Sequence, residues 1–208
     1  MGAAAGETSG AVNRSGMNNV WSIVLASAIV YGALTVFMAV IPGTVLSRTK
    51  PTPGTHPLTA QESRGRDVYV GEGCAYCHSQ VVRPLRQDLV FGRPSVAGDY
   101  AYSTPELLSD HRNGPDLTNI GTRQPSATWQ YIHLWNPRAV VAGSIMPRYP
   151  WLFELKSKSA PNDVVVTVPP SYAPSNGAAI VATDDARALV AYLKALKQVP
   201  LGKGGAGK

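Results

Sequence analysis

The sequence GCAYCH at residues 73–78 contains the only two cysteines of this 208-residue chain, and a histidine directly follows the second cysteine. This spacing is typical of c-type haem attachment, because each thiol can form a thioether with one haem vinyl group while the adjacent imidazole lies below the iron. The motif therefore predicts one covalently bound haem c, held by Cys74 and Cys77, with His78 as an axial ligand.

Two other kinds of site use a Cys-x-x-Cys pair. A redox-active dithiol expects a βαβ unit around the motif, and a zinc site needs two further soft ligands. The chain has no other cysteine that could complete a zinc site. Haem attachment is therefore the preferred interpretation, and a dithiol or a chance match is the alternative.

The second axial ligand of such a haem is usually a methionine or a second histidine, and a Met/His pair raises the reduction potential. The chain has four methionines. Met1 and Met17 lie in a tail of small residues and Met38 lies in an apolar run, which leaves Met146 as the predicted ligand. A methionine that fills a gap in the core is the ordinary alternative for Met146, and His133 is the fallback ligand.

The composition indicates one modest domain with additional segments, since 208 residues with 44% hydrophobic content suffice for a single core. The formal net charge is +6. The basic residues are nevertheless scattered singly, with no run of four or more Lys or Arg. We therefore expect no nucleic-acid partner.

The stretch from 20 to 46 contains no charged residue and predicts a transmembrane anchor in contact with membrane lipid. As a helix, residues 20–41 span roughly 33 Å, enough to cross a hydrocarbon core of about 30 Å before Pro42-Gly43 ends the helix. A cleaved signal peptide is the alternative, but its apolar region runs only about 7–15 residues. Residues 1–19 are expected to form a disordered tail.

The sequence gives two conflicting indications of the side of the membrane on which the domain lies. More basic residues follow the apolar stretch than precede it, which by the positive-inside rule places the domain in the cytoplasm. Haem c, however, is attached on the outer, oxidising side of the bacterial inner membrane. Because a folded domain translocates largely regardless of its charge, we expect a single-pass protein with its haem domain in the periplasm.

The remaining chain predicts a mainly α domain over residues 59–198, joined to the anchor by a Pro-rich linker over 47–58 and followed by a flexible tail over 199–208. Thr59 and Glu62 form a capping-box pattern that opens a helix toward Val70. Thr183 similarly caps a last helix over 186–197. A glycine, Gly65, on one face of the first helix would let these two helices approach closely.

The order of first helix, haem motif, loops, ligand methionine and last helix matches the class I cytochromes c. In that class a proline carbonyl accepts a hydrogen bond from the outer ring N–H of the haem histidine. Pro115, in the turn 113–117, is the candidate for this role. The alternative is that residues 113–117 are a turn with no role at the haem. A middle helix is expected over 125–135, closed by Asn136-Pro137. Residues 164–168 predict a short strand.

Several stretches over about residues 60–155 together resemble the membrane-anchored mono-haem subunit of cbb-type cytochrome c oxidases. They are CAYCHSQ at 74–80 with RPLR at 83–86, SVAG at 95–98, GPDL at 114–117, NPR at 136–138 and MPRYPWL at 146–152. Residues 156–182 depart from the family pattern. The resemblance implies one haem c with His78 and Met146 as axial ligands.

By this resemblance the chain relays electrons to a polytopic subunit that holds haem b and copper and reduces dioxygen. Its donor would be another cytochrome c subunit or a soluble cytochrome c, and no catalytic residue of its own is expected. The alternatives are the cytochrome c subunit of nitric oxide reductase and a free-standing anchored electron carrier. Arg83, Arg86 and Arg148 could steer an acidic donor, bind haem propionates or lie in solvent.

Overall fold

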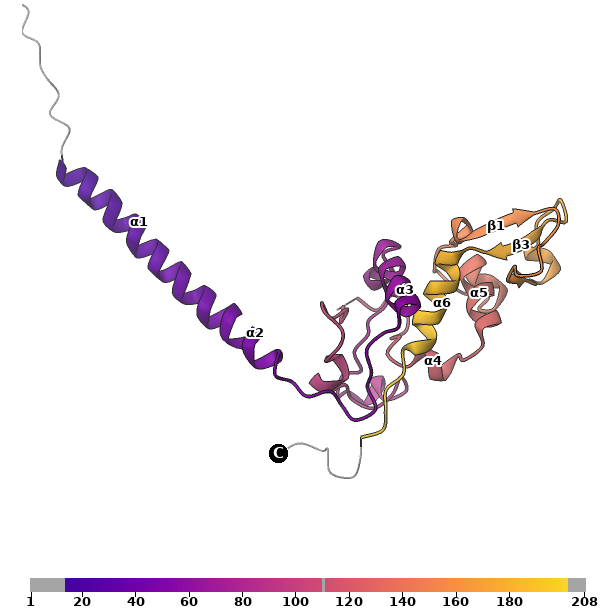
Figure 1. Cartoon of the computed structure of the whole chain (residues 1–208), viewed down its shortest axis with the longest axis horizontal. Coiled ribbons are helices and arrows are strands. Elements are labelled where there is room, and N and C mark those ends of the chain that lie inside the picture. The colour runs from indigo at the N-terminus through magenta and orange to yellow at the C-terminus, as the bar shows by residue number, and fades with distance from the viewer. Residues whose placement is uncertain (1–13, 110, 202–208) are drawn as a thin grey trace, which may run out of the picture. The chain divides into compact units, whose positions relative to one another are not determined.

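The computed structural model describes residues 14–109 and 111–201, and the chain separates into two units between Thr49 and Lys50 (Figure 1). Residues 1–13 of the expected N-terminal tail and 202–208 of the expected C-terminal tail lie outside the described residues. Most described secondary structure is helical, which confirms the predicted fold class.

The N-terminal unit is one helical stretch. It comprises α1 (Arg14–Thr35), a π-helical turn (Val36–Val40) and α2 (Ile41–Leu46). Residues Asn19–Leu46 form a helix of 28 residues. Its most apolar 18-residue window has a mean hydropathy of 2.3 and is not buried within the chain, so the helix is long and apolar enough to cross a membrane.

Two limits of this helix differ from the prediction. The helix begins at Arg14 instead of Val20, and Pro42 does not end it. The N–H of Ile41 donates to Val36 O, five residues back, so the chain widens into a π turn just before the proline. Because proline is accommodated in the first turn of a helix, α2 then continues to Leu46.

The second unit is organised around two helices that pack against each other, α3 (Ala60–Gly71) and α6 (Asp184–Ala195). A Cβ on Gly65 would lie 2.0 Å from the carbonyl oxygen of Ala188, so the close approach requires glycine, as predicted. Beside this contact the rings of Tyr69 and Tyr192 meet edge to face, 5.5 Å between centroids.

The caps of these helices also follow the sequence prediction. Thr59 accepts from the N–H of Glu62, and the Glu62 side chain accepts from the N–H of Thr59, which completes the capping box. The Thr183 hydroxyl accepts from the N–H of Ala186 at the start of α6. Local residue choice therefore determines where both helices begin.

Two shorter helices complete the helical part, α4 (Ile120–Arg123) and α5 (Ala127–Trp135). Ser126 caps α5 by accepting from Trp129 N, and Asn136-Pro137 ends the helix, which confirms the predicted middle helix. The buried hydrophobic core includes Tyr69, Leu117, Leu134, Trp135, Phe153, Ile180, Leu189 and Leu193.

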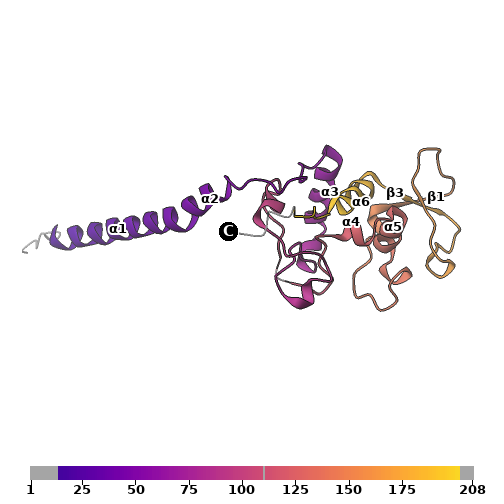
Figure 2. The same cartoon turned by 90° about the horizontal axis from the view of Figure 1, so that it is seen from below.

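Residues 153–182 add a small antiparallel sheet of order β1-β3-β2, from β1 (Phe153–Lys156), β2 (Val165–Val166) and β3 (Ala179–Ala182). Phe153 pairs with Ala182 and Val165 with Val181. In Figures 1 and 2 this sheet lies beyond the N-terminal end of α6, next to α5. The expected strand over 164–168 is thus found in a shorter form, whereas β1 and β3 were missed because each is short and pairs with residues far along the chain.

The proline-rich stretch from Lys50 to Leu58 belongs to the second unit and packs on the rest of it, although a linker was expected over 47–58. Thr52 is buried; its N–H donates to Gly98 O at 3.0 Å and its hydroxyl to Asp99 at 3.0 Å. A Cβ on Gly98 would lie 2.8 Å from Lys50 O. These polar contacts attach the stretch to the domain surface.

Candidate haem-binding site

The Cys-x-x-Cys-His motif directly follows α3. Gly73 has φ of 71°, a left-handed conformation that suits glycine. It turns the chain into a short 3₁₀ helix, Cys74–Tyr76, in which the N–H groups of Cys77 and His78 both bond to Cys74 O, at 3.2 and 3.0 Å. This tight turn brings both thiols and the imidazole together within one turn of chain.

A cavity of about 660 Å³ opens beside this motif, with a largely apolar lining. All five residues predicted to bind the cofactor contribute to its wall: Cys74, Cys77, His78, Pro115 and Met146. The rest of the wall comes from residues of α3, α4, α5 and α6 and from the loops around Pro115 and Met146. The volume is in the range typical of cofactor pockets. Because all five predicted residues line this one cavity, the structure brings them together at a single site.

His78 is held from behind by Pro115. Its Nδ1 lies 2.7 Å from Pro115 O, and because a carbonyl can only accept, Nδ1 carries the proton. This leaves the Nε2 lone pair free to bind a metal. Burial lowers the pKa of His78 from its usual value, and the hydrogen bond to Pro115 acts in the opposite sense, so burial favours the neutral ring that an iron ligand must be.

Gly114 is a site residue that sequence reasoning missed. A Cβ at this position would lie 2.2 Å from Cε1 and 2.7 Å from Nδ1 of His78. Only glycine permits this close contact with the ring. The position directly before Pro115, in a loop already assigned to the histidine, was the signal available in the sequence.

Met146 lies in the loop after α5, partly buried against the core, and its N–H donates to the Ser144 hydroxyl at 3.3 Å. The fallback ligand His133 lines the same cavity. Its ring stacks on Trp129 with 4.6 Å between centroids. Within the described parts of the chain, its buried Nδ1 has no hydrogen-bond partner, and burial lowers its pKa to about 4.

The donor set fits a haem c. Two cysteines, a histidine with its Nδ1 hydrogen-bonded and a methionine line the same largely apolar cavity. Burial raises the pKa of the Cys74 thiol to about 12, so this group is a neutral thiol at pH 7. An apolar cavity with soft and imidazole donors suits a haem better than a hydrated cation.

The three arginines singled out in the sequence do not line the cavity. Arg83 pairs with the buried Asp88 at 2.8 Å. The guanidinium of Arg148 lies over the Trp135 ring, 5.5 Å from its centroid. Arg86 is exposed to solvent. At least two of the three therefore have structural partners within the domain.

Comparison with known proteins identifies the family. Residues 15–171 match the model of the family described as cytochrome c oxidase, mono-heme subunit/FixO. This range includes the apolar helix, the haem motif and the Met146 loop, and it extends into the sheet region. No curated protein matches the chain. Since the match covers more than half of the sequence, the chain belongs to the family of mono-haem cytochrome c oxidase subunits.

Proposed function

We propose that this subunit binds one haem c covalently through Cys74 and Cys77, with His78 and Met146 as axial ligands. The observation that carries the proposal is the shared cavity, because Met146 and His78 line the same space although they lie 68 positions apart in the sequence. When bound, the haem supplies an iron that takes up and releases one electron.

The residues around the cavity have distinct tasks. Pro115 O holds the His78 ring in one orientation and one tautomer. The thioether of Met146 would raise the reduction potential relative to a second imidazole. The largely apolar lining would limit the access of water to the iron. If His78 and Met146 both bind the iron, no open position would remain for a substrate, which favours electron transfer over catalysis.

The subunit would relay electrons from a cytochrome c donor to a polytopic catalytic subunit with haem b and copper, in a cbb-type oxidase that reduces dioxygen. The family match supports this placement over a subunit of nitric oxide reductase. The apolar helix Asn19–Leu46 would anchor the chain in the bacterial inner membrane. Haem attachment requires the domain on the periplasmic side.

Purification from native membranes in mild detergent tests the relay. The expected complex contains haem c, haem b and copper together. Haem c with haem b and non-haem iron but without copper would favour nitric oxide reductase, and haem c alone would favour a free-standing carrier. A Cys74→Ser/Cys77→Ser double variant is the control, since it should lose the covalent haem signal on a denaturing gel.

The location of the domain is tested separately. Protease added to intact spheroplasts should digest the chain from Lys50 onward, whereas inverted membrane vesicles should protect it. Protection in spheroplasts and digestion in inverted vesicles would instead place the domain in the cytoplasm, as the distribution of basic residues suggests.

A further inference from the structure

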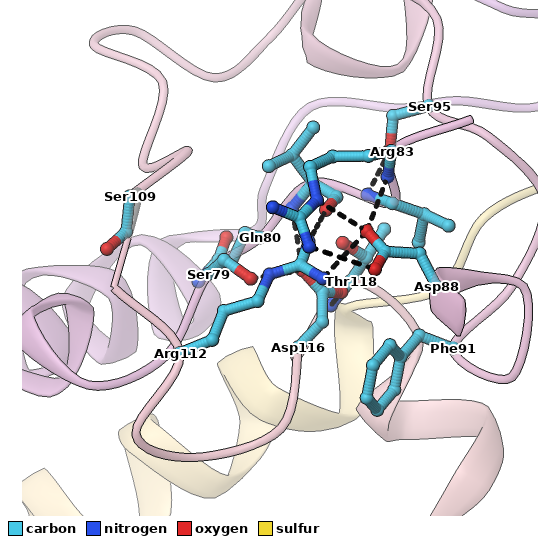
Figure 3. Close-up of polar contacts among 12 residues, drawn as sticks. Ser79, Gln80, Arg83, Asp88, Phe91, Ser95, Ser109, Arg112, Asp116 and Thr118 are labelled. Atoms are coloured by element: carbon cyan, nitrogen blue, oxygen red, sulfur yellow. Dashed lines mark hydrogen bonds and ion pairs between the residues drawn. The ribbon is translucent and has the colours of Figure 1, made fainter. Parts of the chain in front are cut away.

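A cluster of charged side chains forms around two buried carboxylates (Figure 3), and none of its members lines the cavity. Asp116 and Asp88 are 0% and 1% exposed. Arg112 lies between them, with Nη1 2.7 Å from Asp88 and Nη2 3.7 Å from Asp116. Arg83 completes the cluster through its 2.8 Å contact with Asp88. Two buried carboxylates are thus matched by two guanidinium groups, as burial of charge requires.

Asp116 differs from Asp88 in what else it contacts. One carboxylate oxygen accepts from the Ser79 hydroxyl at 2.7 Å and from Val81 N at 2.8 Å. The other accepts from Thr118 N at 2.8 Å. Ser79 directly follows the haem-binding histidine, and Asp116 directly follows the proline that supports it. One carboxylate therefore joins the two chain segments that position the ligand.

Backbone hydrogen bonds surround the same point. Gly114 N donates to Cys77 O at 2.9 Å on one side of the His78–Pro115 contact. Leu117 N donates to Ser79 O at 2.8 Å on the other side. The Asp116 side chain lies at the end of this ladder, where it fixes the register of the two segments. A slip there would move the Pro115 carbonyl relative to the ring.

We propose that Asp116 is a positioning residue for His78 and acts through Ser79 and Pro115. This inference rests on the proposed ligation of iron by His78. A hydrogen bond from Nδ1–H makes an imidazole ligand more basic and fixes the orientation of its ring. A more basic ligand stabilises the oxidised iron, so weakening the contact should raise the reduction potential and rotate the ligand plane.

The test compares three variants of the full chain, loaded with haem and held in detergent. Asp116→Asn removes a charge and some of the hydrogen bonds that the carboxylate accepts. Ser79→Ala removes one of those hydrogen bonds without changing charge. Asp88→Asn is the matched control, because it removes an equally buried charge from the same cluster but leaves the Ser79, Val81 and Thr118 contacts intact.

The readouts are the reduction potential and the electron paramagnetic resonance g-values of the oxidised haem, which report the orientation of the axial ligands. We expect Asp116→Asn to give a more positive potential and altered g-values, and Ser79→Ala to give smaller changes of the same sign. Asp88→Asn should retain the wild-type g-values. If Asp116→Asn fails to fold, Ser79→Ala decides the question alone.

One outcome would overturn the inference, and a different one would overturn the proposed function. The inference fails if Ser79→Ala keeps the wild-type g-values and Asp116→Asn either matches Asp88→Asn in both readouts or does not fold. That result would show that Asp116 contributes no more than a buried charge. A wild-type protein without a low-spin Met/His signature would instead refute the proposed function itself. The wild-type spectrum therefore distinguishes failure of this inference from failure of the underlying haem assignment.

Discussion

The backbone of Gly114 lies against the imidazole of His78 so closely that a Cβ would be 2.2 Å from the ring atom Cε1. Real Cβ atoms do not approach this near, and the ring also donates to Pro115 O. Position 114 therefore has no room for a side chain while the ring keeps this place. This contact gives the most direct mutational test of how the ligand is held.

Gly114→Ala should displace the His78 ring and lower the haem content per polypeptide severalfold, with an overpacking cost of about 1–3 kcal/mol. Absorbance of the purified protein, normalised to protein mass, measures the effect. Pro115→Ala is the control, since it adds no atom near the ring and retains the carbonyl that accepts from Nδ1. Equal haem loss in both variants would contradict the steric explanation.

Gly65→Ala should destabilise the domain by about 1–3 kcal/mol, because the added methyl would lie 2.0 Å from Ala188 O and force α3 away from α6. Gly71→Ala in the same helix is the matched control, as nothing lies within 4 Å of a Cβ there. Helix propensity alone predicts a small gain for an added methyl in a helix. Denaturant unfolding of both variants gives the comparison, and similar midpoints would refute the packing argument.

Met146→Ala should lower the reduction potential by about 100 mV or more, well inside the range of ~0.8 V that axial ligands span. The reduced protein should also bind carbon monoxide, because one iron position becomes open. His133→Ala should retain the wild-type spectrum. If the His133 variant binds carbon monoxide and the Met146 variant does not, then the histidine is the ligand and the sequence prediction is wrong.

Asp88 predicts how stability depends on acidity. The hydrogen bonds from Arg83, followed by those from Arg112, hold the pKa of this carboxyl well below its usual value of 3.8. Because the folded state binds the proton less well than the unfolded state, this contribution to stability is present above about pH 4 and is lost as the pH falls below it.

Thermal unfolding followed by circular dichroism between pH 6 and pH 3 measures the effect. The wild-type midpoint should fall more steeply over this range than that of Asp88→Asn, which has no carboxyl to protonate at this position. The variant should also be less stable at pH 6, since Arg83 and Arg112 lose their buried partner. Parallel pH profiles would show that Asp88 does not control acid stability.

Features with a short sequence range could be predicted correctly. The capping box at Thr59, the cap at Thr183 and the end of α5 at Asn136 each depend on residues within one turn of the chain, so the local sequence contains the necessary information. The presence of an apolar helix long enough to cross a membrane follows in the same way from an uninterrupted run of uncharged residues, although both predicted limits of the helix were wrong. Even there, the π turn before Pro42 shows that a proline signal does not always end a helix.

The candidate site also has some features that the local sequence determines and others that depend on tertiary packing. Residues 73–78 determine by themselves that two thiols and an imidazole share one turn, because that arrangement needs only local backbone geometry. Only the tertiary structure decided three other features of the site: Met146 reaches the same cavity, Gly114 leaves room for the ring, and Asp116 joins two distant segments. Those contacts, like the β1–β3 pairing, depend on how distant segments pack, and residue type alone does not specify the partner across such separations.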